Sequence, residues 1–290
     1  MPGGSASTRF ADVRHFDSVP STNSVAAELA RPGLVVVAGH QHAGRGRLGR
    51  TWEAPPGSSL LVSVVLDVSW VWDGRPQLAT LALGLAASDA CSAVAGVRPM
   101  LKWPNDLVVG DGGDGKVGGI LAETVPHARA FGGWCLSLSA LRAEAADLPL
   151  TSTFAPRGGR RQGGRPPKEG LDTSLLVAGL GLNVRWGDRP PPPPGTSLDA
   201  LGADVEPLAL LAPLLERLDA RLDQGPDALL DGYRARCATL GRAVRIEQAG
   251  RDDVEGTAVG VTPEGHLVVR DVGGDLCTVV AGDVVHLRPG

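Results

Sequence analysis

The chain has 290 residues, of which 43% are apolar and 21% are charged, the usual balance of a soluble globular protein. The formal net charge of -4 excludes the global positive charge that attracts a protein to nucleic acid or to an anionic membrane, so any anion site must be local. The four cysteines are scattered without a CxxC pair, which predicts buried thiols in a reducing compartment and no zinc site.

The cytoplasm is the predicted location of the protein. Residues 1–12 are small and polar, without the basic and apolar halves of a secretion signal. The most apolar long segment, residues 78–95, contains Thr80, Ser88 and Asp89, so it is typical of a core helix rather than a membrane span.

The first predicted helix covers residues 24–30. Ser21 or Thr22 is placed to cap it, and Pro32 ends it. From local chemistry alone, this cap is the favoured explanation of the triplet Ser-Thr-Asn that begins at Ser21.

Three arginines alternate with three glycines in residues 41–52, the segment called the arginine loop below. The loop starts at Gln41, just after a buried strand predicted over residues 34–38, and precedes a second strand over residues 59–66. Its sequence is Gln-His-Ala-Gly-Arg-Gly-Arg-Leu-Gly-Arg-Thr-Trp. Glycine lets the backbone approach a ligand closely, and guanidinium groups fit phosphate or carboxylate oxygens two at a time. We interpret the loop as a flexible cationic segment that binds an anion; the alternatives are a solvated turn and an RGG-like contact with nucleic acid.

A core helix over residues 78–95 is predicted to lie against the sheet, and an interrupted strand follows it. Residues 100–109 are an apolar strand with Pro104 in its middle, where proline removes a donor of the sheet ladder. We expect a bulge or bend there, which aims Asn105 and Asp106 out of the sheet.

Lys116 opens the next strand, predicted over residues 116–123 after a glycine-rich hairpin at residues 111–115. The paired glycines Gly118 and Gly119 weaken this strand but let a ligand or another chain pack on its backbone. Only three of the 28 basic residues are lysines, so arginine is the default cation of the chain. A lysine in such a position indicates a need for a compact ammonium group.

The pattern degrades between about residues 126 and 173. Within this region, residues 157–168 are rich in arginine and glycine and low in complexity. Such a composition cannot bury enough apolar surface to order itself, so we predict a disordered surface insertion. A contact with RNA or with an acidic partner is the weaker alternative.

Regular structure resumes with a buried strand over residues 174–184, in which Gly179 and Gly181 leave one face bare and Asn183 lies at the end. A polyproline loop, two helices and five short alternating runs then follow. They cover residues 190–194 for the loop, 206–222 and 227–240 for the helices, and 243–247, 253–261, 266–271, 276–280 and 284–287 for the runs. The runs are separated by glycines and predict a small carboxy-terminal β barrel.

Five motifs, in this order and spacing, resemble those of the biotin protein ligases. They are Ser-Thr-Asn at 21–23, Gly-Arg-Gly-Arg-Leu-Gly-Arg-Thr-Trp at 44–52, Lys-Trp-Pro-Asn-Asp at 102–106, Lys-Val-Gly-Gly-Ile-Leu-Ala-Glu at 116–123 and Gly-Leu-Gly-Leu-Asn-Val at 179–184. The resemblance implies an α+β fold, with a mixed-sheet catalytic domain of the biotin/lipoate ligase type and a small SH3-like β barrel. The corresponding division is a flexible tail over residues 1–15, a catalytic domain over 16–240 and the barrel over 241–290.

The resemblance also implies the activity. Members of this family join the carboxylate of biotin to the α-phosphate of ATP, release pyrophosphate, and pass biotin to one lysine of a biotin carboxyl carrier domain. ATP and Mg²⁺ are the implied cofactors, and the carrier domain of a biotin-dependent carboxylase is the implied partner. Only some fifteen residues precede the resemblance, so the chain is similar to the monofunctional members, which lack a DNA-binding helix-turn-helix domain. A monomer or a ligand-linked dimer is expected, with no specific binding to DNA or to membranes.

The site residues follow from the same resemblance. The expected catalytic cations are Lys116, Arg45 and Arg47, which neutralise the charge that builds up when a carboxylate approaches a polyphosphate. The residues expected to hold biotin are Ser21, Thr22, Asn23, Gln41, Gly44, Arg45, Arg47, Lys116 and Gly118. Those expected on the nucleotide side are Arg47, Arg50, Trp52, Lys102, Asn105, Asp106 and Asn183. Asp106 is also the candidate carboxylate for Mg²⁺, with a turn-capping carboxylate as the alternative.

Two other functions are weighed against this one. A lipoate or octanoate ligase shares the fold and the acyl-adenylate chemistry, but the Gly-Arg-Gly-Arg and Lys-Trp-Pro-Asn-Asp motifs favour biotin. A nucleic-acid-binding module would use the arginine loop, the basic insertion and the small barrel. The net negative charge and the lack of aromatic residues among the basic ones argue against it.

Overall fold

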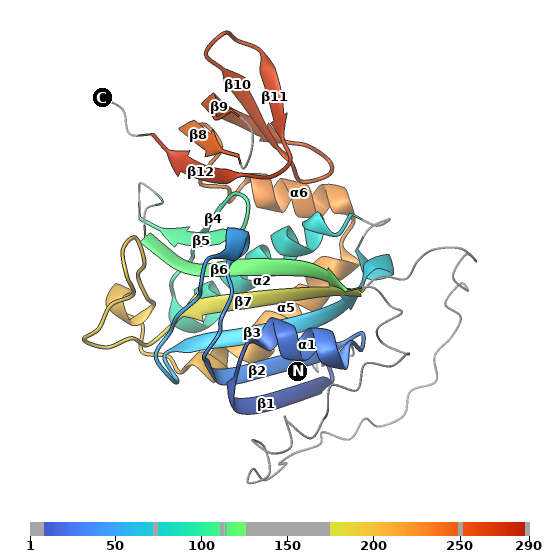
Figure 1. Ribbon diagram of the computed structural model, residues 1–290, viewed down its shortest axis with the longest axis vertical. Coiled ribbons are helices and arrows are strands. Elements are labelled where there is room, and N and C mark those ends of the chain that lie inside the picture. The colour runs from blue at the N-terminus through green and yellow to red at the C-terminus, as the bar shows by residue number, and fades with distance from the viewer. Residues whose placement is uncertain are drawn as a thin grey trace, which may run out of the picture.

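The computed structural model describes residues 9–71, 75–110, 113, 115–125, 175–248 and 252–287. Two sheets organise these residues (Figure 1): a seven-stranded sheet in the order β1-β2-β3-β7-β6-β5-β4, and a five-stranded sheet in the order β11-β10-β9-β8-β12. In the larger sheet β1 and β2 are parallel and the other neighbours are antiparallel. The predicted α+β class with a mixed sheet is therefore confirmed. The insertion predicted between residues 126 and 173 lies outside the described residues.

The strands of the larger sheet follow the apolar runs of the sequence. The strands predicted over residues 34–38, 59–66, 116–123 and 174–184 are confirmed, with small shifts at their ends. The seven strands are β1 (Asp12–Val19), β2 (Leu34–Gln41), β3 (Ser59–Asp67), β4 (Met100–Lys102), β5 (Asp106–Val109), β6 (Gly115–Val125) and β7 (Leu175–Asn183). Val109 lies opposite Gly115, as the predicted glycine-rich hairpin requires.

The amino-terminal tail is shorter than predicted, because β1 begins at Asp12 and not after residue 15. Before this strand, Phe10 is buried and Arg9 forms an ion pair with Asp219. β1 is an edge strand with most of its side chains exposed or half-buried, so its apolar pattern is too weak to stand out in the sequence.

Residues 100–109 form a hairpin, so the predicted bulge or bend within one strand is wrong. β4 and β5 pair in antiparallel fashion, with Lys102 opposite Asp106, and the Trp103–Pro104 peptide between them is cis. A proline in a turn leaves no ladder hydrogen bond missing, whereas in mid-strand it would. The turn is tied to β6 because the side-chain amide of Asn105 donates to the carbonyl of Ile120 at 2.9 Å, and Ile120 N donates to Asn105 O at 2.9 Å.

Alternate side chains of the sheet enter two apolar cores, one on each face. Along β2, Val35 and Val37 belong to the larger core, whereas Leu34 and Val36 belong to the smaller one. Helix α1 (Thr22–Leu29) covers the smaller core, and α2 (Gln77–Ala95), α5 (Leu211–Asp223) and α6 (Pro226–Arg234) cover the larger one (Figure 1). Both faces of the sheet therefore contribute to an apolar core.

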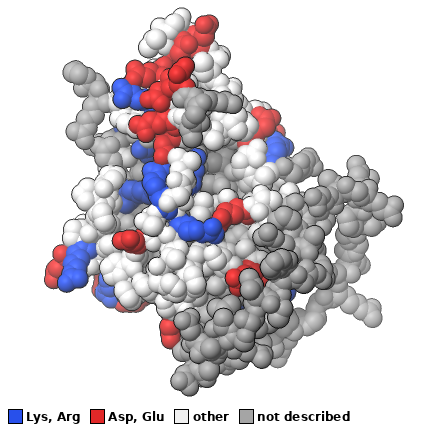
Figure 2. Space-filling model, in the orientation of Figure 1, with Lys and Arg blue, Asp and Glu red and all other residues white. Residues whose placement is uncertain are grey.

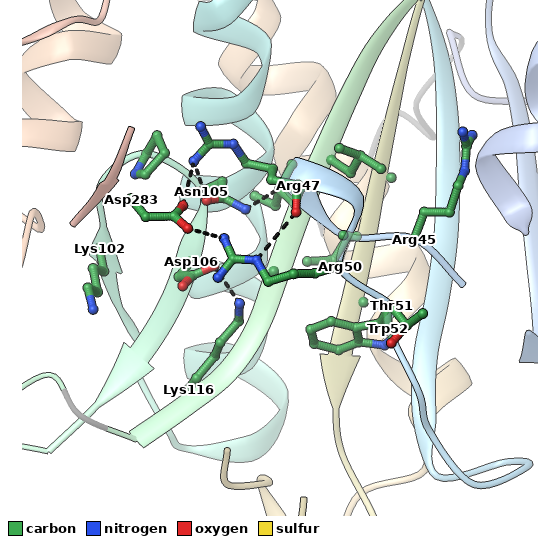
Figure 3. Close-up of a pocket in the computed structure, with 18 of the residues that line it drawn as sticks. Arg45, Arg47, Arg50, Thr51, Trp52, Lys102, Asn105, Asp106, Lys116 and Asp283 are labelled. Carbon is green, nitrogen blue, oxygen red and sulfur yellow. Dashed lines mark hydrogen bonds and ion pairs between the residues drawn. The ribbon is translucent and has the colours of Figure 1, made fainter. Parts of the chain in front are cut away.

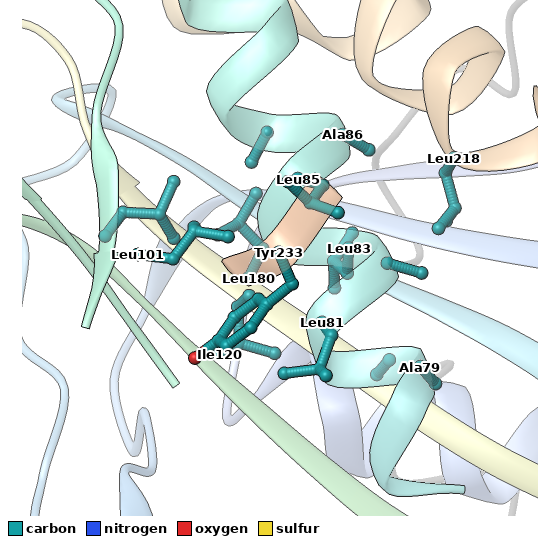
Figure 4. Close-up of a cluster of buried hydrophobic side chains, with 14 of the residues drawn as sticks. Ala79, Leu81, Leu83, Leu85, Ala86, Leu101, Ile120, Leu180, Leu218 and Tyr233 are labelled. Carbon is teal, nitrogen blue, oxygen red and sulfur yellow. The ribbon is translucent and has the colours of Figure 1, made fainter. Parts of the chain in front are cut away.

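Helix α2 is long and apolar enough to cross a membrane, but 67% of its most apolar window is buried inside the protein. Its leucine side chains pack among those of β4, β6, β7 and α5 (Figure 4). A helix that is apolar on all sides is stable in water only when other elements surround it. The prediction of a core helix over residues 78–95 is confirmed.

The two carboxy-terminal helices differ from their predicted bounds. The first begins with a 3-10 turn, η5 (Pro207–Leu210), and continues as α5. The second was predicted over residues 227–240, but α6 ends at Arg234. The chain beyond it leaves the helix in turns and forms a bridge to β4, in which Leu101 N donates to Arg236 O at 2.9 Å and Ala238 N donates to Leu101 O at 2.8 Å. Pairing with β4 therefore competes successfully with continuation of the helix.

The smaller sheet contains all five of the predicted short strands. They are β8 (Ala243–Glu247), β9 (Val254–Val261), β10 (Leu267–Asp271), β11 (Leu276–Val279) and β12 (Asp283–His286). Their apolar core is continuous with that of the larger sheet. Trp103 joins the two parts, since its indole N–H donates to Gly265 O at 3.0 Å and its backbone N–H to Thr239 Oγ1 at 3.1 Å. The β4–β5 hairpin is thus fixed against the smaller sheet.

Candidate active site

A cavity of about 330 Å³ opens where the arginine loop, the β4–β5 hairpin, β6, β7 and β12 meet. This volume is within the range of small-molecule sites. Figure 2 shows basic side chains gathered below the acidic surface of the smaller sheet. Most residues predicted to hold biotin or nucleotide line the cavity: Ser21, Thr22, Asn23, Gln41, Arg45, Arg47, Arg50, Trp52, Lys102, Asn105, Asp106 and Lys116.

The arginine loop closes on itself between Gly44 and Trp52. Trp52 N donates to Gly44 O at 2.9 Å, and a Cβ atom at Gly44 would lie 2.3 Å from Trp52 O. Gly49 has a φ of +75°, which residues other than glycine rarely adopt. Gly44 does not line the cavity itself. Gly44 lacks a Cβ atom, and this allows the loop to close on Trp52.

All three arginines of the loop form ion pairs with carboxylates of other elements, and those of Arg45 and Arg50 are the more exposed. Arg45 Nη2 lies 2.9 Å from Glu123 Oε2 on β6. Arg50 Nη2 lies 2.5 Å from Asp283 Oδ2 at the start of β12 (Figure 3). These pairs join the loop to both sheets. Both arginine side chains are about half exposed, so each pair by itself contributes at most about 1 kcal/mol to stability.

Arg47 is the most enclosed arginine of the loop, with a side chain 19% exposed. Its Nη1 donates to Asn105 Oδ1 at 3.2 Å and to Gly282 O at 3.3 Å, and it lies 3.7 Å from Asp283 Oδ1. Burial lowers the pKa of Arg47, and the attraction of Asp283 opposes this effect. Because an arginine remains protonated in proteins, the structure holds a fixed positive charge in the wall of the cavity.

Ser21, Thr22 and Asn23 form a buried polar floor, with 3–4% of each residue exposed. Thr22 N and Thr22 Oγ1 both donate to Gln41 Oε1, at 2.7 and 3.0 Å. The Ser63 hydroxyl lies 2.7 Å from Thr22 Oγ1 and 2.6 Å from Asn23 Oδ1. Ser21 occupies the cap position of α1, but its side chain makes no cap hydrogen bond and the helix already begins at Thr22. The predicted explanation of this triplet as a helix cap is therefore wrong.

The bare glycine face predicted on β7 is filled by side chains of the site. A Cβ atom at Gly179 would lie 2.1 Å from Asn23 Oδ1, and one at Gly181 would lie 2.5 Å from Cε2 of Trp52. Gly119 of β6 supports the same indole ring, since a Cβ there would lie 3.3 Å from Trp52 Cζ3. These glycines leave the space in which Asn23 and Trp52 sit against the sheet.

Lys116 and Asp106 form an ion pair between neighbouring strands. Lys116 Nζ lies 2.7 Å from Asp106 Oδ1 and 5.8 Å from the centroid of the Trp52 ring. The two charged side chains are 31% and 23% exposed, so the pair remains accessible from the cavity (Figure 3). Within the described residues no group of three or more acidic, histidine or cysteine side chains is arranged to hold a metal ion.

Two further predicted residues do not line the cavity. Gly118 is buried between strands, where a Cβ atom would lie 2.9 Å from Gly181 O, and the adjacent Gly119 faces the cavity instead. Asn183 is also buried, and its side-chain amide donates to Thr196 O at 3.0 Å. Gly118 is adjacent to Gly119, and Asn183 lies two residues beyond Gly181, and both of these neighbours line the cavity.

Three residues that the sequence analysis missed complete the site. Ser63 is a buried hydroxyl in the middle of the apolar strand β3, which was a usable signal. Glu123 ends the motif that begins at Lys116, and its carboxylate accepts from both Asn23 and Arg45. Asp283 lies more than two hundred residues from the arginine loop, so no local pattern indicates its contact with Arg50.

Comparisons with known proteins agree with this site. A model of the biotin/lipoate A/B protein ligase family matches residues 15–137, and a model of the biotin protein ligase C terminal domain matches residues 239–287. The biotin–[acetyl-CoA-carboxylase] ligase of Mycobacterium tuberculosis is 35% identical, over 95% of this chain and 90% of that protein. The ligase of the same name from Paracoccus denitrificans is 31% identical, over 88% and 92%.

A solved structure shows the same fold. The biotin protein ligase from Aquifex aeolicus, in complex with biotin and ATP, superposes with a TM-score of 0.69 over 97% of this chain and all of that one, at 23% identity. One assignment follows from the two family models, the two relatives that are similar over nearly their whole length, and this common fold. The chain belongs to the biotin protein ligase family.

Proposed function

We propose that this chain activates biotin with ATP and transfers the biotinyl group to a lysine of a biotin carboxyl carrier domain. The observation that carries the proposal is the meeting, in one cavity, of a neutral polar floor with a cationic wall. The hydroxyl and amide groups of Thr22, Asn23 and Gln41 suit an uncharged ureido ring. Arg47 and Lys116 suit a carboxylate and a phosphate that must be brought together.

Known relatives support the substrate. The mycobacterial and Paracoccus proteins are named as biotin–[acetyl-CoA-carboxylase] ligases, and the Aquifex structure contains biotin and ATP. Their names supply the carrier of acetyl-CoA carboxylase as the partner class for this chain.

In the first step, a carboxylate oxygen of biotin attacks the α-phosphorus of ATP, and the bond from that phosphorus to pyrophosphate breaks. Arg47 and Lys116 lower the repulsion between the two anions and stabilise the charge that develops on the phosphate oxygens. In the second step, the carrier amine attacks the acyl carbon, the bond to AMP breaks, and the amine loses a proton. Trp52 and the arginine loop shield the mixed anhydride from water before the amine arrives.

Mg²⁺ is proposed to enter with the nucleotide. This ion commonly binds through one or two carboxylates together with substrate phosphates, rather than in a site made wholly by protein. Asp106 supplies one such carboxylate at the cavity wall, beside Lys116. When the ion is bound, it supplies charge neutralisation at the phosphates. A cytoplasmic location, a monomer or ligand-linked dimer, and the lack of specific DNA binding remain predictions.

The test is ATP–pyrophosphate exchange with either biotin or lipoate as the acid. Exchange that depends on biotin is expected, followed by transfer of labelled biotin to an isolated carrier domain. Exchange with lipoate alone would move the assignment to the lipoate ligases, and exchange with neither acid would remove acyl-adenylate formation altogether.

A further inference from the structure

The polyproline loop predicted at residues 190–194 extends to Thr196 in the structure, and it returns from the end of β7 to the beginning of β6, where it meets Lys116. Lys116 N donates to Pro194 O at 2.9 Å, and Thr196 N donates to Lys116 O at 2.8 Å. Lys116 and Gly195 therefore form a parallel bridge, outside any regular strand pair. Both backbone groups of Lys116 on this edge are bonded to the loop.

This bridge replaces a strand that the sheet lacks at this point. The pairing of β6 with β7 stops where Gly118 lies opposite Leu182, two residues short of Lys116. On the other edge, Lys116 lies opposite Val108 of β5, directly beside a shift in register. Without the loop, the backbone N–H and C=O of Lys116 would lose these two partners, next to an irregular part of the ladder.

The loop is built to keep a single shape. Proline residues restrict its backbone, and Pro191 is buried. Gly195 N donates to Pro192 O at 2.7 Å, and a Cβ atom at Gly195 would lie 2.7 Å from both Pro191 Cβ and Pro192 O. The side chain of Asn183 donates to Thr196 O and fixes the far end of the loop to β7.

We infer that the polyproline loop positions Lys116 for catalysis, by serving as its missing neighbour strand. The inference rests on the proposed function, because it assumes that the Lys116 ammonium acts on the reacting phosphate. Pro191 and Gly195 are positioning residues in this scheme, since they act through the backbone of Lys116. Displacement of a catalytic group by about 1 Å can lower a rate by up to about a hundredfold.

The test is Gly195→Ala, which forces the loop apart at the contact between Gly195 and Pro191. We expect kcat of biotin-dependent ATP–pyrophosphate exchange to fall by roughly ten- to a hundredfold, while KM for biotin changes by less than about threefold. Biotin affinity measured by calorimetry serves as the check that the variant is folded. Gly225→Ala is the matched control, because Gly225 also lies next to a proline but has no atom within 4 Å of an added Cβ. Pro191→Ala loosens the same contact without overfilling it, so it should lower kcat in the same direction by a smaller factor.

A double-mutant cycle separates positioning from general damage to the cavity. In a Lys116→Ala background, single-turnover adenylate formation should be nearly insensitive to Gly195→Ala, because the group that the loop positions is already gone. An undiminished effect in that background, or exchange at the wild-type rate in Gly195→Ala, would overturn the inference. Absence of exchange in the wild type and in Gly225→Ala would instead mean that the proposed function is wrong.

Discussion

Replacing Gly181 with alanine tests whether Trp52 is seated on the bare face of β7. The added Cβ would lie 2.5, 2.7 and 2.8 Å from Cε2, Nε1 and Cζ2 of the indole. Since ordinary carbon contacts are about 3.5–4.0 Å, the ring must retreat by about 1 Å or leave its seat. Overpacking of this kind costs about 1–3 kcal/mol, and loss of half the burial of a tryptophan costs a similar amount. We therefore expect Gly181→Ala to lower the free energy of unfolding by about 1–3 kcal/mol.

Urea unfolding followed by circular dichroism measures this change directly. Gly260→Ala is the matched control, because Gly260 also lies in a strand but an added Cβ would come no closer than 4.0 Å to Val268. This control should change the free energy of unfolding by less than about 0.5 kcal/mol.

The deciding comparison is Gly181→Ala in a Trp52→Ala background. There the added methyl group meets no indole, so most of its cost should disappear, with a coupling energy of about 1–2 kcal/mol between the two sites. Additive effects of the two substitutions would refute the seating of Trp52 on this glycine. A loosened loop should also release the adenylate faster, because Trp52 and the arginine loop enclose the same cavity.

Three further predictions concern the catalytic cation, the core and the insertion. Lys116→Ala should slow single-turnover adenylate formation by at least about a hundredfold while the thermal unfolding midpoint stays near that of the wild type; an unchanged rate would remove Lys116 from the mechanism. Asp89 pairs with Arg221 at 2.6 Å and Arg236 at 2.5 Å, and although burial favours its neutral form, the hydrogen bonds from these arginines hold its pKa below the usual value. The stabilisation by the Asp89 carboxylate is therefore complete above its unfolded pKa of about 4, and it is lost as the pH falls through the lower folded pKa. Asp89→Asn should lower the free energy of unfolding in urea by about 2–4 kcal/mol at pH 7 and by progressively less in acid. A difference between variant and wild type that does not change with pH would contradict the pairing. Deletion of residues 157–168 should leave the rate of biotin transfer nearly unchanged, and a large loss would show that the insertion takes part in function.

The helices and strands were mostly predictable from the sequence, because burial of a helix or strand requires a regular pattern of apolar residues. The apolar run of β3 and the length of α2 both reflect elements that are mostly buried. β1 escaped prediction because it is an exposed edge strand, and the β4–β5 hairpin because a central proline is compatible with either a bend or a reversal. The end of α6 was misplaced since pairing with Leu101, distant in sequence, decides it.

The candidate site was likewise predicted only in part from the sequence. Glycine spacing alone indicated the close approach at Gly181 and the turning of the arginine loop, because the lack of a Cβ atom is a local property. The side chains that contact these glycines and arginines could not be predicted from the sequence. The order of the strands brings Trp52 onto β7, and the packing of the smaller sheet brings Asp283 to Arg50.

Residue types suited to the chemistry were visible in the sequence: a cationic loop, a lysine at a strand edge and the Ser-Thr-Asn triplet. The buried floor made by Thr22 and Asn23, and the bonds between the polyproline loop and Lys116, became evident in the folded protein alone. Hydrogen bonds and ion pairs depend on distances between segments, whereas apolar periodicity records only how each segment is buried.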